Sequence, residues 1–322
     1  MKGVILMYEI IQNDSNDLTR QPDLFDLYTR FINYIDVSEN TVKTYSRALK
    51  QFFKYLASEG IAQPQRSDIL AYKQQLADAG RKASTIQGYI IAVRQFFKWT
   101  EQEGLYPNVA NNVKGAKISK SHKKDYLTTK QIQTVLNTIP TDTVKGIRDY
   151  AILALMVTGG LRTIEVSRAN IEDMRTVGDS TALFIQGKGK DDKNDYIKLS
   201  DEVETAIRMY LQTRPTAQPT DPLFASTSNN NLNKPLTTRS ISGVVKQALR
   251  DAGFNSDRLT AHSLRHSTGT LNLLNGGTLE ETQQLLRHSN INTTMIYLHH
   301  LERENNKSEE RISNAIFKNR KG

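Results

Sequence analysis

The chain has 322 residues, with 43 Lys and Arg against 34 Asp and Glu, and therefore a formal net charge of +9. It contains no cysteine, which excludes disulfides, thiolate metal sites and a cysteine nucleophile. The positive surplus suits a polyanionic partner, because each neutralised phosphate releases condensed counterions, but charge alone does not identify one.

Residues 1–21 form a short N-terminal extension with little pattern. Their apolar stretch is too short for a signal peptide or a membrane span, and no later run reaches the ~18 apolar residues that a span needs. We therefore expect a cytoplasmic protein.

Between residues 22 and 112, apolar side chains recur at helical spacing. The pattern predicts helices around 24–35, through 45–56 with an end at Gly60, near 69–76, and from Ser84 through 97. Four helices of this length indicate a small all-α domain.

Residues 113–125 interrupt this periodicity and offer little to bury. The stretch has one aspartate and five lysines, Lys114, Lys117, Lys120, Lys123 and Lys124. It is interpreted either as a solvated linker or as a basic strap along a phosphate backbone, and both can hold at once.

A second domain is expected over residues 126–300. Thr128 and Gln131 form a capping box for its first helix, and an apolar helix through 150–157 ends at two glycines. A hairpin is predicted from 182–186 and 196–199, around the turn GKGKDDKND. Further helices are expected near 201–213, 238–252, 263–275, 279–287 and 291–300. The fold class is therefore mainly α with a small β-sheet or hairpin.

Three short segments contain side chains suited to chemistry on an anion. In GGLRTIEV, Arg162 and Glu165 would share a helical face, so that the carboxylate could hold the guanidinium. In HSLRH, His262 and Arg265 would also share a face. The spacing of His262 and His266 is that of a zinc-binding H-E-x-x-H, but the required glutamate is absent, so we expect no metal site.

The third segment is LLRHSNINTTMIY, which holds Arg287, His288 and Tyr297. A tyrosine at helical spacing is commonly a half-buried core residue, and its phenol, with a pKa near 10, needs cations or a base to become a nucleophile. Gly187-Lys188-Gly189-Lys190 at the hairpin tip is not a P-loop, because the required pattern is missing.

In this order and spacing, GGLRTIEV, QGKGKDDKNDYIKL, HSLRHSTGTL and LLRHSNINTTMIYLH resemble the tyrosine recombinase (phage integrase) family. The resemblance covers residues 126–300. It extends more loosely to 22–112, where STIQGYIIAVRQFFKW looks like the helical core-binding domain of the family. In size and layout the chain is similar to the simple Xer-type recombinases.

The resemblance implies a role for each matching residue. Tyr297 would attack the scissile phosphorus, while Arg162 and Arg265 grip its non-bridging oxygens. Lys188 would protonate the leaving 5′ oxygen, with Lys190 as a competitor for this role. The remaining roles are acid/base chemistry near the tyrosine by His262, a hydrogen bond to phosphate by His288, and orientation of its neighbours by Glu165. Neither metal nor ATP is expected.

Further side chains are expected to contact DNA: Lys43, Arg94, Arg287, and the five lysines of 113–125. The sequence departs from the family pattern at Arg287, where glycine often precedes the histidine, and at Gly159, where Thr or Ser is frequent. Arginine at 287 suggests a different helix cap or an additional phosphate contact.

The implied assembly is a C-shaped clamp on DNA that forms a homotetramer on two sites, with accessory proteins as further possible partners. The tail, residues 301–322, ends in a small apolar face with Ile312, Ala315, Ile316 and Phe317. It is expected to be exchanged between protomers, although docking on its own domain is the alternative. The protein would then be nucleoid-associated.

Two rival functions fit parts of the pattern: a type IB topoisomerase, and a non-catalytic sequence-specific DNA-binding protein. The filled catalytic positions and the HSNINTTMIY stretch favour a recombinase. The sequence is compatible with chromosome dimer resolution, mobile-element integration or excision, plasmid resolution and DNA inversion, and the target site depends on which side chains reach the bases.

Overall fold

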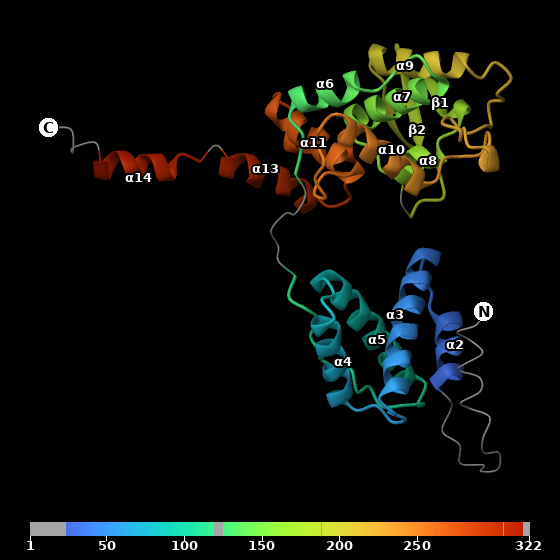
Figure 1. The fold of residues 1–322 in the computed structure, drawn as a ribbon, viewed down its shortest axis with the longest axis vertical. Coiled ribbons are helices and arrows are strands. Elements are labelled where there is room, and N and C mark those ends of the chain that lie inside the picture. Colours follow the sequence, from blue (N-terminus) through green and yellow to red (C-terminus); the bar gives the residue numbers. More distant parts are fainter. Residues whose placement is uncertain (1–23, 119–124, 188, 305, 318–322) are drawn as a thin grey trace. The chain divides into compact units, whose positions relative to one another are not determined.

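The computed structural model describes residues 24–118, 125–187, 189–304 and 306–317. The chain divides into two compact units, Met1–Ser121 and His122–Gly322. The first unit is helical and the second combines helices with a small sheet (Figure 1), so the predicted fold class, mainly α with a small sheet, is confirmed. None of the described helices is long and apolar enough to cross a membrane.

The first unit contains the four predicted helices. These are α2 (Leu24–Tyr34), α3 (Glu39–Ser58), α4 (Arg66–Asp78) and α5 (Ala83–Gln102). Their apolar faces meet in an aromatic core in which Phe52, Phe96 and Phe97 are fully buried, and Phe53 packs edge-on to Phe96. After α3 the chain turns at Gly60, whose φ of +67° suits glycine.

The second unit begins with the predicted capping box, in which the Thr128 hydroxyl accepts from the backbone N–H of Gln131 and the Gln131 side chain accepts from that of Thr128. Its helices are α6 (Thr129–Asn137), α7 (Val144–Gly159), α8 (Thr163–Arg168), α9 (Asp201–Gln212), α10 (Thr238–Asp251), α11 (Ala261–Leu274), α12 (Leu279–Leu286), α13 (Asn292–Glu304) and α14 (Ser308–Phe317), with short 3₁₀ turns η1 (Ile171–Asp173) and η2 (Asn229–Asn231).

The sheet has one strand more than the predicted hairpin. Strands β1 (Met174–Val177), β2 (Ser180–Ile185) and β3 (Asp195–Lys198) form an antiparallel sheet in the order β1-β2-β3. The strand that sequence reasoning missed, β1, has only four residues and none of them is fully buried. It therefore lacks the alternation of apolar and polar residues by which a strand is recognised.

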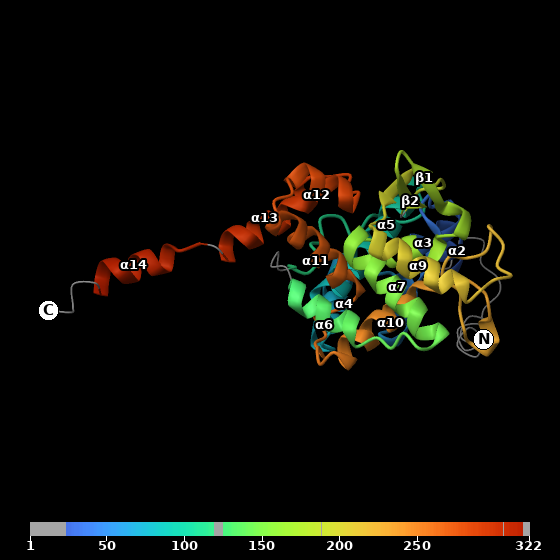
Figure 2. The same cartoon turned by 90° about the horizontal axis from the view of Figure 1, so that it is seen from above.

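Helix α7 is the centre of the second unit and is buried nearly all round. It ends at Gly160, whose φ of +58° reverses the chain. A Cβ there would meet the side chains of Leu286 and Thr268, so glycine also allows close packing at this turn. Helices α11, α12 and α13 pack on one another (Figure 2), and α11 also packs on α7.

The last described helix, α14, buries none of its side chains. Ile312, Ile316 and Phe317 are all more than half exposed. The domain boundaries at residues 22, 112, 125 and 300 stay predictions.

Candidate active site

A cavity of about 370 Å³ in the second unit gathers most of the predicted catalytic side chains. They come from the start of α8, from α11 and from the segment between α12 and α13. Its walls include Arg162, Glu165, Gly187, Lys190, Asp195, His262, Arg265, Arg287, His288, Ser289 and Thr293. Segments that lie more than a hundred residues apart in the sequence therefore build one site.

Arg162 and Glu165 do pair, but not as neighbours on a helix face. Arg162 is the residue just before α8, and Glu165 lies in its first turn. The carboxylate accepts from the Arg162 backbone N–H and from its Nη1, both at 2.8 Å. Glu165 is fully buried, whereas the Arg162 side chain remains 32% exposed toward the cavity.

Arg265 is nearly buried in α11, with 2% of its surface exposed. Its guanidinium donates to the backbone carbonyls of Gly160 and Leu286, so two other segments hold it in place. Burial, together with the neighbouring Arg162 and Arg287, lowers the pKa of Arg265 to about 9. An anion bound here would relieve this accumulation of like charge.

Arg287 forms a different helix cap, which is one of the two possibilities that the sequence suggested. It ends α12 with a left-handed backbone, φ +51°, a conformation that costs a non-glycine residue ~1–2 kcal/mol. Its side chain is only 8% exposed, and its Nη2 lies 3.0 Å from Glu165 Oε2. The guanidinium therefore bonds inside the protein, and the expected DNA contact of Arg287 stays a prediction.

The carboxyl of Glu165 is thus shared by two arginines. Burial by itself would raise its pKa, but Arg287 and Arg162 outweigh burial and hold the pKa of Glu165 below its ordinary value. The guanidiniums of Arg162, Arg265 and Arg287 line the same cavity as this carboxylate, which leaves the cavity with an excess of fixed positive charge.

His288 lies in the same cavity, and its Nδ1 is 2.9 Å from Thr294 Oγ1. Burial, and then the charges of Arg265, Arg162 and Arg287, lowers the pKa of His288 to about 4. The ring is therefore neutral at pH 7. His262, in the first turn of α11, lines the cavity and is exposed.

Tyr297 of α13 is beside this cavity but, among the described residues, not one of those that line it. Only 5% of its surface is exposed, and its ring contacts those of His266 and His288. Burial raises the pKa of Tyr297, while Arg265 and Arg162 partly counteract this. The Tyr297 phenol is therefore close to the guanidiniums of Arg162 and Arg265, but it is packed inside the protein.

Three residues near the tyrosine were not assigned a role from the sequence. They are His266, Gly269 and Thr294. His266 was considered only as a metal ligand, and nothing in the linear pattern indicates that Gly269 touches the tyrosine ring. The T-T pair of the third segment is the one signal that could have pointed to Thr294.

Lys188 lies outside the described residues. Its competitor Lys190 does line the cavity, where its Nζ is 2.7 Å from Asp195 Oδ2. This hydrogen bond and charge raise the pKa of Lys190. A lysine whose proton is held more tightly is a poorer general acid, so this ion pair disfavours Lys190 for proton donation.

The expected DNA contacts fall in both units. Lys43, Arg94, Lys114 and Lys117 are exposed, while Lys120, Lys123 and Lys124 lie outside the described residues. Lys43 belongs to a basic face of α3 that lines a shallow depression together with Arg47, Lys50 and Lys54. Sequence reasoning missed the last three, although their spacing of three or four residues places them on one helix face.

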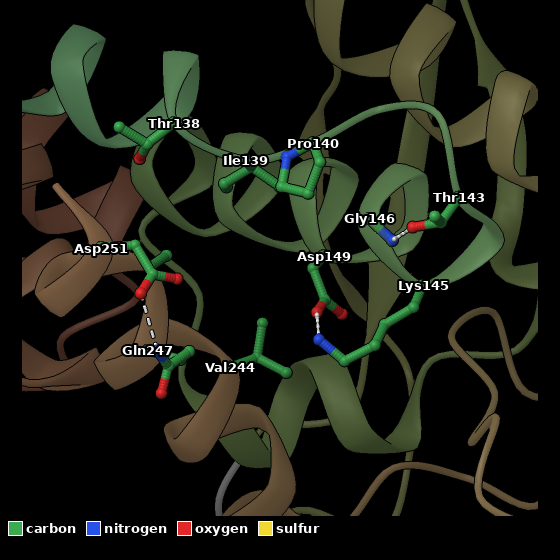
Figure 3. Close-up of a pocket in the computed structure, with 11 residues that line it drawn as sticks. Thr138, Ile139, Pro140, Thr143, Lys145, Gly146, Asp149, Val244, Gln247 and Asp251 are labelled. Atoms are coloured by element: carbon green, nitrogen blue, oxygen red, sulfur yellow. Dashed lines mark hydrogen bonds and ion pairs between the residues drawn. The ribbon is translucent and has the colours of Figure 1, made fainter.

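A second cavity, of about 90 Å³, lies between the connection of α6 to α7 and helix α10 (Figure 3). Its polar groups bond to one another: Lys145 to Asp149, Gln247 to Asp251, and the backbone N–H of Gly146 to the Thr143 hydroxyl. It shares no residue with the first cavity, and we do not assign it a role in chemistry.

Within the part of the chain that the structure describes, no three His, Asp or Glu side chains are grouped so that they could hold a metal ion. The cavity instead presents guanidiniums and imidazoles. Such a set is suited to binding a phosphate group through paired, charge-assisted hydrogen bonds.

Comparisons with known proteins agree with this geometry. Residues 125–304 match the phage integrase family, and residues 26–104 match the phage integrase N-terminal SAM-like domain. The chain is 29% identical to the tyrosine recombinase XerD of Listeria monocytogenes over 285 residues, covering 85% of this chain and 94% of that protein. It is 31% identical to the tyrosine recombinase XerA of Pyrococcus horikoshii over 275 residues, covering 84% and 88%.

Two solved structures have a similar fold. One is the XerH site-specific recombinase in a pre-cleavage complex with its difH substrate, with a TM-score of 0.67, 21% identity, and coverage of 84% of this chain and 79% of that one. The other is the Tn1549 transposon integrase in complex with circular intermediate DNA, with a TM-score of 0.69, 20% identity, and coverage of 85% and 94%.

Proposed function

Because the chain belongs to the phage integrase family of tyrosine recombinases, we propose that it cuts and rejoins DNA at specific sites through a covalent 3′-phosphotyrosine intermediate. One observation carries this proposal. Arg162, Arg265, His262 and His288 line one cavity, and Tyr297 lies against the ring of His288.

The scissile phosphate would occupy the cavity with its non-bridging oxygens on Arg162 and Arg265. In the pentacoordinate transition state these oxygens carry close to two negative charges, and planar guanidiniums can bond them in pairs. Both guanidiniums are already held, Arg162 by Glu165 and Arg265 by two backbone carbonyls. Donors fixed in advance at a developing charge are usually the largest catalytic contribution.

The covalent step forms a bond between the Tyr297 oxygen and phosphorus and breaks the bond from phosphorus to the 5′ oxygen. His262 would accept the phenolic proton, and Lys188 would donate a proton to the departing 5′ oxygen. His288 is neutral at pH 7, so it can hydrogen-bond phosphate without adding to the cationic charge. Rejoining reverses these steps with the 5′ hydroxyl of another strand, so no nucleotide is consumed.

Tyr297 has to leave its packed position to attack, because it is buried and does not line the cavity. Movement of α13 would bring the phenol toward Arg162 and Arg265. Their charges counteract the effect of burial on the pKa of Tyr297, and bound DNA would position the phosphate at the same time. The proposed nucleophile is thus activated after DNA binding.

The substrate is double-stranded DNA containing a recombination site. Residues 22–112 are proposed as the core-binding domain, 113–125 as a basic linker and 126–300 as the catalytic domain, which together would clamp the duplex. A homotetramer on two sites would exchange strands in pairs through a four-way junction. The exposed apolar face of α14 supports exchange of the tail with a neighbouring protomer.

The two rival functions are not favoured. A type IB topoisomerase would relax supercoils without preference for a site, whereas the relatives are site-specific recombinases and integrases. A non-catalytic DNA-binding protein would not need three arginines and a buried carboxylate in one cavity beside a tyrosine.

Covalent trapping tests the function directly. The protein is incubated in EDTA with nicked duplex fragments taken from around its own gene, and the products are separated under denaturing conditions. We expect a protein–DNA adduct that Tyr297→Phe abolishes while the gel shift of the same fragment persists. Selective binding without any adduct would instead support the non-catalytic function.

A further inference from the structure

The backbone of Arg287 has a conformation in which glycine would be unstrained, yet a long charged side chain is present. Arg287 is the C-cap of α12 with φ +51°, and its side chain is 8% exposed. An arginine that served only to end the helix would have no reason to bury its guanidinium. The buried position therefore indicates that the side chain itself has a structural role.

The contacts of that guanidinium join three segments. Nη1 donates to the carbonyls of Leu285, at the end of α12, and of Gly159, at the end of α7. Nη2 donates to the carbonyl of Gly160 and to Glu165 Oε2, at 3.2 and 3.0 Å. Arg287 thus ties the ends of α7 and α12 to the first turn of α8.

Because Glu165 also bonds Arg162, a fixed Glu165 restrains the Arg162 side chain. Its Oε2 accepts from Arg287 and from the Arg162 backbone N–H, which leaves Oε1 for the Arg162 guanidinium at 2.8 Å. Because Glu165 is fully buried, it has little freedom to turn while both arginines hold it. Arg162 is 32% exposed, and this ion pair holds its side chain.

We propose that Arg287 is a positioning residue, which fixes Glu165 and through it aims the guanidinium of Arg162 at the scissile phosphate. This inference rests on the proposed function, since it assigns Arg287 a part in phosphate activation. It replaces the direct DNA contact expected from the sequence with an indirect role. Without Arg287, Glu165 would be a buried carboxylate with one partner, free to rotate together with Arg162.

Single-turnover cleavage of a nicked substrate tests the proposal in two backgrounds. Arg287→Gly should cleave about 10²-fold more slowly, the loss expected when a reacting group is misplaced by about 1 Å, while its gel shift changes by less than about twofold. In an Arg162→Ala background the same substitution should change the rate by less than about twofold, because the residue through which it acts is gone. An equal loss in both backgrounds, or no loss in either, overturns the proposal.

A matched control separates positioning from general destabilisation. Arg148 is also a buried arginine, 4% exposed in its side chain, and it bonds the carboxylate of Asp149, which belongs to the second cavity. Arg148→Lys and Arg287→Lys each keep a charge and lose the planar fork. Both substitutions should lower thermal stability. Only Arg287→Lys should also slow cleavage, and it should do so in the wild type but not in the Arg162→Ala background.

A measurement on the free protein separates this inference from the proposed function. With ¹⁵N-labelled arginine, the Nε–Hε signal of Arg162, assigned by its loss in Arg162→Lys, should show order in the wild type and averaging in Arg287→Gly. If Arg287→Gly does not fold, Arg287→Lys, which keeps the charge and leaves Glu165 in place, serves instead. An Arg162 signal that is the same in both proteins overturns the inference. If the Arg162 signal does change but the wild type forms no covalent adduct with DNA, only the proposed function is overturned.

Discussion

Tyr297 lies edge-on to His266, with their ring centroids 4.7 Å apart and their planes at 77°. His266 is itself buried on α11, one residue after Arg265. The helix that supplies Arg265, the proposed phosphate-binding arginine, therefore also supplies part of the packing site of Tyr297, the proposed nucleophile. Movement of α13 away from this packing site is the step that our proposed mechanism requires before attack.

Gly269 allows the close approach of α13 to α11. A Cβ at this position would lie 2.8 Å from Leu286 Cδ1 and 3.1 Å from the Tyr297 ring. We expect Gly269→Ala to lower the free energy of unfolding by ~1–3 kcal/mol, as overpacking does, and to displace Tyr297 toward solvent. Urea denaturation measures the first effect, and nitration of the Tyr297 peptide, followed by mass spectrometry, measures the second.

Gly243→Ala is the control for this substitution. Gly243 lies within α10, where an added Cβ meets nothing within 4 Å. Alanine there should leave Tyr297 nitration unchanged and stabilise the protein by ~0.5–1 kcal/mol through its helix preference. Equal nitration in both alanine variants would contradict the packing role of Gly269.

The imidazole of His288 should stay neutral well below the pH at which an ordinary histidine is protonated. Its pKa in the folded protein is about 4, against 6.5 for the unperturbed group. The unfolded state therefore binds the proton first, so the contribution of His288 to stability is complete above pH ~6.5 and is lost progressively as the pH falls toward 4. Folding free energies from urea titrations between pH 7 and 4 should show this loss.

His288→Gln should remove part of that pH dependence, because glutamine does not titrate. In an NMR titration of the wild type, the His288 ring should shift with a midpoint near 4. A midpoint near 6.5 for His288 would mean that the arginines around it do not act on it as the structure indicates.

The two lysines of the hairpin should differ in a way that identifies the general acid. Lys188→Ala should slow cleavage of the ordinary phosphodiester by ~10²–10⁴-fold. A substrate with sulfur in place of the bridging 5′ oxygen should restore most of that loss, because a thiolate leaves without a proton. Lys190→Ala should lose less activity and gain nothing from sulfur, since Lys190 is bound to Asp195. If the sulfur substrate restored the activity of Lys190→Ala but not that of Lys188→Ala, Lys190 would be the general acid instead of Lys188.

The basic face of α3 should contribute to DNA affinity through phosphate contacts. Arg47→Ala should weaken binding for all sequences alike and reduce the slope of log affinity against log salt by ~0.9, the value for one phosphate contact. Lys43→Ala should have the smaller effect, because Lys43 is already paired with Glu39 at 2.6 Å. Fluorescence anisotropy at several salt concentrations measures both. A slope that neither substitution changes would place this face away from DNA.

The apolar face of α14 should act between protomers. Deletion of residues 312–322 should abolish cooperative occupation of two adjacent half-sites, because it removes Ile312, Ile316 and Phe317. Binding of a single protomer to one half-site should persist. Gel-shift titrations on one-site and two-site fragments compare these directly, and equal weakening on both would indicate a tail that packs on its own domain.

Much of this protein could be predicted from its sequence alone. Apolar periodicity is local, so it identified the four helices of the first unit and the buried helix that became α7. The order and spacing of Arg162, His262, Arg265, His288 and Tyr297 resembled the family to which the chain belongs, and the roles that this resemblance implies stay predictions. Apolar periodicity and each short motif depend on neighbours within a few positions along the chain, and the order of the motifs is read directly from the sequence.

What Arg287, Gly269 and His266 contact was decided only by the tertiary structure. Their partners lie on other helices: Arg287 reaches Glu165 and the end of α7, while Gly269 and His266 meet Tyr297. In the linear sequence a cationic arginine near a phosphate-binding motif favours a DNA contact, and a glycine within a helix carries no sign of what packs against it. Only the packing of α7, α11, α12 and α13 brings these groups into contact. Burial then decides the difference between the two arginines: Arg162 stays partly exposed in the cavity, whereas Arg287 is buried against Glu165.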